Sequence, residues 1–162
     1  MIHATLVALV TLTTSTGPLA AQEMLDGTWR LVSSTRTNTA TGATTDSFGP
    51  NPRGYITYSR DGRMMVLIAR SDRPKPESIA KITDEQRNRL FSSMLAYAGT
   101  YSFDGRTIEH HIDISWNEVW SGTSQVRDVK KDGDRLVYTT QLAPSALDGT
   151  MGFATLVWEK LK

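Results

Sequence analysis

Cysteine is absent from the 162-residue sequence. This absence excludes disulfide bridges and zinc sites built from cysteine, so the core alone must stabilise the fold. Histidine is scarce, with three residues, and the 18 basic residues nearly balance 17 acidic ones without clustering. Such a charge distribution does not favour a nucleic-acid surface or a polybasic membrane patch. The expected partner is therefore a small molecule or another protein, and not nucleic acid.

Charged side chains are also missing from the first segment, Met1–Ala21. Its apolar stretch, Ala4–Leu12, is too short to span a bilayer as a helix, and Gly17-Pro18 interrupts any helix. Small residues at Ala20-Ala21 suit cleavage by a signal peptidase. This layout predicts a secretory signal peptide, although the usual basic start is missing. We expect an exported protein, periplasmic or secreted, with one domain over residues 22–162 and no membrane span in the mature chain.

Strand patterns dominate the rest of the sequence. Three Asp-Gly pairs, at positions 61–62, 104–105 and 132–133, separate alternating segments and supply the positive φ of tight hairpins. One segment, Thr83–Leu95, has helical spacing and a capping box between Thr83 and Gln86. Sequential antiparallel strands have unpaired edges unless the sheet closes. The sequence therefore predicts an all-β domain: a single antiparallel eight-stranded barrel with one short helix covering an end.

Alternation along each strand predicts which side chains face the interior. In Arg106–Ser115, His110 shares its face with three isoleucines, whereas His111 lies on the opposite face. Segment Ser124–Lys130 permits two phases, and we favour the one with Arg127 inward because the other buries two charges. The expected interior comprises Trp29, Leu31, Ile56, Tyr58, Met64, Val66, Ile68, Tyr101, Phe103, Ile108, His110, Ile112, Ile114, Gln125, Arg127, Val129, Leu136 and Tyr138.

A series of short motifs follows the strands in order. The motifs are Gly27-Thr28-Trp29-Arg30-Leu31-Val32-Ser33, Gly54-Tyr55-Ile56-Thr57-Tyr58, Tyr97-Ala98-Gly99-Thr100-Tyr101, His110-His111, Gln125-Val126-Arg127 and Leu156-Val157-Trp158-Glu159. The series, from about Gly27 to Lys160, resembles the family of bacterial and fungal lipocalin-like domain proteins. This resemblance implies a lipocalin-like barrel, and it implies the fold more than an activity. The histidine, the Gln-x-Arg pair and the strand tyrosines that recur in the family fall on His110, Gln125, Arg127, Tyr58 and Tyr101.

An apolar wall with a few convergent polar groups is typical of a ligand site. We expect the barrel to bind a small apolar or amphipathic ligand in its lumen. The candidate ligand-binding residues are Tyr58, Tyr101, His110, Gln125, Arg127 and Tyr138. Two alternatives stay open. The first is a cavity enzyme of the isomerase or cyclase type that uses His110 as acid or base, and the second is a structural or interaction domain with a filled barrel.

Other chemistries find little support in the sequence. His110 and His111 point to opposite faces of a strand, so they cannot chelate one metal ion together, and no metal or other cofactor is expected. The sequence contains no nucleophile elbow, P-loop or dinucleotide-binding fingerprint. Trp116 and Trp120 follow the histidine strand, near the expected barrel mouth, where they plug the end or form a binding rim. We favour the plug, and we favour a fixed cover over a mobile lid for the helix; the oligomeric state stays open.

Overall fold

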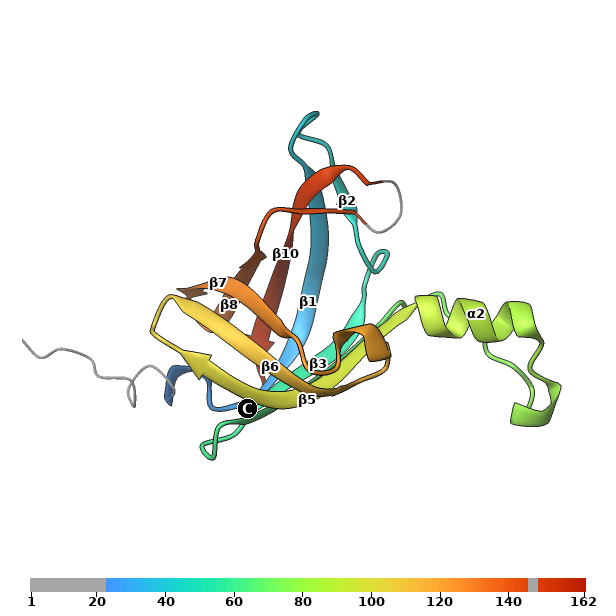
Figure 1. Cartoon of the computed structure of the whole chain (residues 1–162), viewed down its shortest axis with the longest axis horizontal. Coiled ribbons are helices and arrows are strands. Elements are labelled where there is room, and N and C mark those ends of the chain that lie inside the picture. Colours follow the sequence, from blue (N-terminus) through green and yellow to red (C-terminus); the bar gives the residue numbers. More distant parts are fainter. Residues whose placement is uncertain (1–22, 146–148) are drawn as a thin grey trace, which may run out of the picture.

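The computed structural model describes residues 23–145 and 149–162, and the expected signal peptide at Met1–Ala21 lies outside this range. Within it, one sheet of ten antiparallel strands curls into a closed barrel (Figure 1). Two short strands, β2 (Thr44–Asp46) and β9 (Ala143–Pro144), only extend the sheet. The closed ring consists of β1 (Gly27–Asn38), β3 (Arg53–Tyr58), β4 (Arg63–Ala69), β5 (Met94–Phe103), β6 (Thr107–Ser115), β7 (Ser124–Asp132), β8 (Arg135–Thr140) and β10 (Met151–Lys160). The predicted eight-stranded barrel is confirmed.

Tight turns join three pairs of neighbouring strands. The glycines of the three Asp-Gly pairs, Gly62, Gly105 and Gly133, have φ values of 80°, 99° and 58°. These values lie in the region that only glycine adopts at little cost, so the turns form where the sequence predicts them. The barrel then closes where β1 pairs with β10, with Leu31 opposite Trp158.

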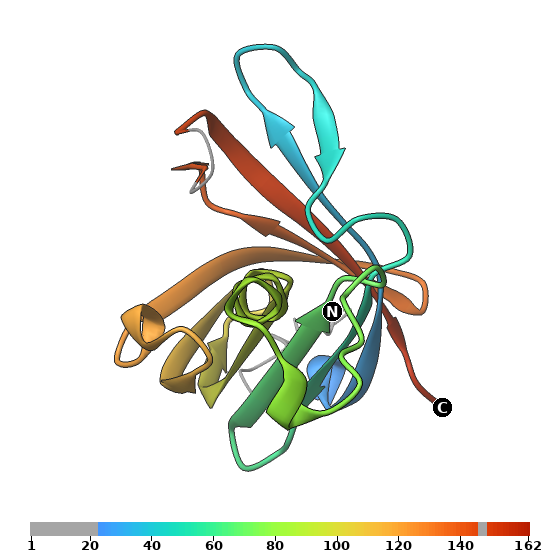
Figure 2. The same ribbon diagram turned by 90° about the vertical axis from the view of Figure 1, so that its right-hand side faces the viewer.

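The two ends of the barrel differ. The Asp-Gly turns share one end, and near it the side chain of Leu25 is fully buried in the core. Its carbonyl oxygen accepts a hydrogen bond of 2.7 Å from the indole nitrogen of Trp29. The longer connections lie at the other end, which we call the mouth (Figure 2). They contain η1 (Ile79–Lys81) and α2 (Asp84–Ser92) between β4 and β5, and η2 (Glu118–Trp120) between β6 and β7.

Helix α2 begins as the sequence predicts but ends earlier. Thr83 and Gln86 form the reciprocal capping box. The helix stops at Ser92, and Met94 and Leu95 belong to β5 instead. It stands at the mouth end, where the cover was expected, but it extends outward and none of its residues is buried. In the described ranges, no helix is long and apolar enough to cross a membrane.

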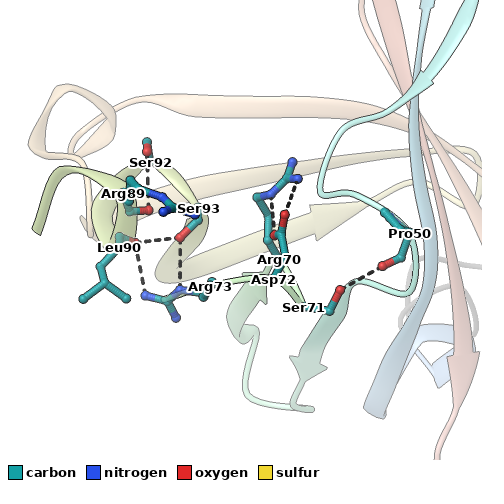
Figure 3. A network of polar contacts seen from close by, with 9 residues as sticks. All are labelled: Pro50, Arg70, Ser71, Asp72, Arg73, Arg89, Leu90, Ser92 and Ser93. Carbon is teal, nitrogen blue, oxygen red and sulfur yellow. Dashed lines mark hydrogen bonds and ion pairs between the residues drawn. The ribbon is translucent and has the colours of Figure 1, made fainter. Parts of the chain in front are cut away.

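Polar contacts hold both ends of the connection between β4 and β5, which contains α2 (Figure 3). The guanidinium of Arg73 donates to the carbonyl oxygen of Leu90 at 3.1 Å and to the hydroxyl of Ser93 at 3.1 Å. On the incoming side, the Ser71 hydroxyl donates to the carbonyl oxygen of Pro50 at 2.9 Å. The Arg73 contacts satisfy groups at the C-terminus of α2, so the helix is anchored at that end.

Alternation predicts most of the core correctly, but it places one residue, Ile114, on the wrong face. Arg127 and Val129 are buried, so the favoured phase of β7 is confirmed. Ile114 was expected inside but is 65% exposed. A β-bulge shifts the register, because Gly99 pairs with Ile112 and Ala98 pairs with Ile114. The extra residue turns Ile114 outward, since a slip of one residue reverses the face that a side chain occupies.

Candidate functional site

A histidine surrounded by tyrosines lies inside the barrel. His110, on β6, is fully buried. Its Nε2 atom lies 2.8 Å from the hydroxyl of Tyr58, and its Nδ1 atom lies 2.8 Å from the hydroxyl of Tyr97. Tyr138, on β8, donates a 3.0 Å hydrogen bond to the Tyr58 hydroxyl. Side chains from four strands therefore form one buried chain of hydrogen bonds, which we call the tyrosine–histidine network.

Burial keeps every member of this network uncharged near neutral pH. It lowers the pKa of His110 well below its usual range, and the charge of Arg127 lowers it further. Burial also raises the pKa of Tyr58, Tyr97 and Tyr138. The imidazole is neutral, but both of its ring nitrogens are engaged. A role as general acid or base would therefore require one of these hydrogen bonds to break first.

Arg127 brings a positive charge next to the network. Its side chain is 8% exposed, and one guanidinium nitrogen lies 3.4 Å from Nδ1 of His110. The same nitrogen donates to the backbone oxygen of Gln125 at 3.2 Å. In residues 23–145 and 149–162, no carboxylate forms an ion pair with it. A buried charge without a counter-ion is costly, so this arginine calls for an explanation beyond packing.

A small pocket adjoins Arg127 and the network. Its volume is about 20 Å³, which is room for about one water molecule, so side chains fill most of the lumen. Trp158 is 1% exposed, and its indole N–H has no hydrogen-bond partner among the described residues. Leu95 and Leu156 are only half-buried and mark the side of the mouth. The pocket is lined by Ile56, Val66, Ile68, Leu95, Tyr97, His110, Arg127, Tyr138, Leu156 and Trp158.

The sequence profile of the lipocalin-like domain family matches residues 26–161. The chain belongs to the lipocalin-like domain family. The expected resemblance is thereby confirmed, and the closed barrel agrees with it. Among solved structures, a lipocalin-like protein from Bacteroides uniformis is similar, with a TM-score of 0.44 and 14% sequence identity over 85% of this chain and 99% of that chain. No curated protein shows significant similarity to this chain.

The lipocalin-like barrel brings four of the six predicted site residues together: Tyr58, His110, Arg127 and Tyr138. The other two contact this group, but their side-chain polar atoms are not part of it. Tyr101 packs edge-on against Tyr58, but its hydroxyl donates to the carbonyl oxygen of Ser59 at 3.3 Å, near an Asp-Gly turn. Gln125 is half-buried, and its backbone oxygen is the group that contacts Arg127.

Sequence reasoning missed two residues of this site. Tyr97 lies two and four positions before the inward Gly99 and Tyr101, so alternation places it inside once the strand is extended back to it. Trp158 faces the lumen from β10, whose inward phase we did not assign. Its signal was the closing motif of the family resemblance, which contains this tryptophan.

Aromatic side chains connect the mouth of the lipocalin-like barrel to the network. Trp120, in η2, lies edge-on to Tyr97 with ring centroids 6.0 Å apart, and Trp116 meets Trp120 at 5.1 Å. The indole of Trp116 donates to the carbonyl oxygen of Phe91 at 3.2 Å, which ties the end of α2 to this row. Both tryptophans are half-buried, and Trp120 packs on the core. Both side chains keep part of their surface exposed at the mouth end, and the plug stays a prediction.

A larger groove lies on the outer face of the barrel. It has a volume of about 500 Å³ and runs beside β1, β3 and β4. Tyr55 and Leu67, which are cross-strand neighbours, are 51% and 48% exposed there. Arg53 also lines the groove, together with Arg30, which is paired with Glu159 at 2.8 Å. None of the predicted site residues contributes to this outer groove.

Proposed function

We propose that this lipocalin-like barrel binds a small amphipathic molecule at its mouth, with the polar group of that molecule beside Arg127. The observation that carries the proposal is the burial of Arg127 without a carboxylate partner among the described residues. Buried arginines are normally paired, because an isolated charge loses its hydration without compensation. A bound molecule would supply the missing partner.

The shape of the site supports entry from the mouth. The pocket itself holds only about 20 Å³, so the bulk of a ligand must lie above it. Leu95 and Leu156 are half-buried and pack on the core, as does Trp120, whose ring lies against Tyr97. Leucine side chains change rotamer on short timescales, and their displacement widens the opening without moving the barrel backbone. The apolar part of the ligand would replace the contacts that these leucines now make.

A neutral fluorescent probe, N-phenyl-1-naphthylamine, tests the site without relying on charge. We expect saturable binding of one probe per chain, and we expect Leu156→Trp to abolish it by filling the mouth. Leu67→Trp, which adds the same bulk in the outer groove, is the matched control and should leave binding unchanged. No binding to the wild-type chain, or binding that Leu156→Trp does not reduce, would overturn the proposal.

The outer groove favours a second candidate, an interaction domain with a filled barrel. A volume of about 500 Å³ with exposed Tyr55 and Leu67 is within the range of ligand and peptide sites. The same pair of variants separates the two functions. Loss of probe binding in Leu67→Trp alone would favour the outer groove, and loss in Leu156→Trp alone would favour the lumen.

We further propose that the protein is exported, periplasmic or secreted, after removal of Met1–Ala21. The uncharged apolar segment and the small residues at its end support this. The full chain should be produced in a bacterial host with a periplasm, and the product sequenced from its N-terminus. The expected first residue is Gln22, and Ala21→Arg should block processing. An unprocessed wild-type chain in the cytosolic fraction would contradict export.

A further inference from the structure

The buried pocket of the lumen is rich in hydrogen-bond donors. The indole N–H of Trp158 has no partner in the described part of the chain, although the side chain is 1% exposed. The guanidinium of Arg127 carries five N–H groups, and its hydrogen bonds to the described residues use a single nitrogen. Both groups can donate but cannot accept. Among the residues that the structure describes, no aspartate or glutamate lines the pocket.

The tyrosine–histidine network has one hydrogen more than its internal contacts use. Three tyrosine hydroxyls and one N–H of the neutral imidazole make four hydrogens, whereas the network has three contacts, Tyr138–Tyr58, Tyr58–His110 and Tyr97–His110. One hydroxyl hydrogen is therefore left over in either tautomer of the imidazole. Because the Arg127 guanidinium can only donate to Nδ1, Nε2 carries the imidazole hydrogen, and the unused hydroxyl hydrogen is that of Tyr58. The network offers Arg127 one neutral acceptor, Nδ1 of His110 at 3.4 Å, and among the described residues the Trp158 indole has no acceptor at all.

We propose that the group bound in this pocket is a carboxylate, and that the ligand is a small monocarboxylic acid with an apolar tail. The inference rests on the proposed function and adds its chemical class. A carboxylate is acceptor-only, and its single negative charge matches that of Arg127. Its flat shape suits a narrow pocket, with one oxygen directed at the Trp158 indole and the other at the guanidinium. The tail then extends between Leu95 and Leu156 toward the mouth.

Three probes of equal chain length test this: decanoate, decanol and decylamine, titrated at neutral pH. Decanoate should bind roughly tenfold to a hundredfold more tightly than decanol, because a hydrogen bond to a charged group is the stronger one. Decylamine should bind most weakly, since its ammonium group meets only donors. The NMR signal of the Trp158 indole N–H, assigned through Trp158→Phe, should move downfield with decanoate as it gains an acceptor.

Two variants keep the result specific. Arg127→Met preserves side-chain length and should reduce decanoate binding to the level of decanol while decanol binding persists, which also shows that the variant is folded. Arg53→Met removes an arginine from the outer groove and should change neither. Equal binding of decanoate and decanol, or decanoate binding that Arg127→Met leaves intact, would overturn the carboxylate assignment while the lumen site stands. Failure of all three probes, together with N-phenyl-1-naphthylamine, would overturn the proposed function itself.

Discussion

The buried His110 makes the stability of the barrel depend on pH in a defined direction. Burial, followed by the charge of Arg127, lowers its pKa well below the usual value of 6.5. In the unfolded chain the imidazole titrates near that value. Below about pH 6.5 the imidazole of His110 is therefore protonated in the unfolded state but stays neutral in the folded state. The free energy of unfolding should fall with decreasing pH, by up to about 1.4 kcal/mol per unit, until the imidazole protonates in the folded state.

Urea unfolding, followed by tryptophan fluorescence at pH 7.5, 6.5 and 5.5, measures this slope. His110→Gln should be less stable at pH 7.5, because it loses contacts with Tyr58 and Tyr97, but its pH slope should be flatter than that of the wild type. His111→Gln is the matched control, since His111 lies on the outer face with Nδ1 3.0 Å from the Ser124 hydroxyl. An equally steep slope in His110→Gln would refute the reasoning. So would an NMR titration that gives His110 a folded-state midpoint near 6.5.

Three further changes test the barrel and its mouth. Gly99→Ala places a Cβ against the backbone of β6 and should destabilise the fold by at least about 3 kcal/mol in urea unfolding. Gly122→Ala is the control: its Cβ meets open space, and its φ of 76° should cost only about 1–2 kcal/mol. Similar losses in the two variants would argue that the close approach at Gly99 is not a steric requirement. Leu95→Ala should lower the free energy of unfolding by about 1–2 kcal/mol because the side chain is half-buried. It should also raise the affinity for N-phenyl-1-naphthylamine in a fluorescence titration. An unchanged affinity would show that this leucine does not restrict entry at the mouth. Arg73→Ala removes the anchor of α2 and should speed proteolysis within residues 74–93 about fivefold to tenfold, while Arg87→Ala, an exposed arginine on the same helix, should cleave at the wild-type rate.

Alternation was sufficient to predict most of the barrel interior from the sequence. The period of a strand is local, and each Asp-Gly turn resets it at a visible position, so the inward phase of residues such as Ile108 and Leu136 follows directly. The bulge beside Gly99 is different. It depends on the close approach of the glycine to the backbone of the neighbouring strand, which is a contact between segments. Ile114 was therefore assigned to the wrong face.

The candidate site was half predictable for a similar reason. His110 and Arg127 stand out because polar residues on an inward face are rare. Tyr97 was missed because α2 ends at Ser92 and β5 begins at Met94. The apolar residues around this junction fit the spacing of a helix as well as that of a strand. The volume of the pocket was beyond the sequence altogether. It depends on how side chains from several strands pack together in the lumen, and the pattern along a single strand does not determine that packing.

The pairing of β1 with β10 has a consequence for folding. Leu31 and Trp158 are partners across this seam, 127 positions apart (158 − 31), whereas the Asp-Gly hairpins join neighbours in the sequence. Local hairpins form quickly, but a seam of such separation waits for the rest of the sheet, because the entropy of closing the chain is lost before the contact is gained. The pocket is lined from β3 as well as from β10, and these two sides of the sheet come together only when the seam closes. A molecule bound there would thus act on the closed barrel alone, and its concentration would set how much of the chain is closed.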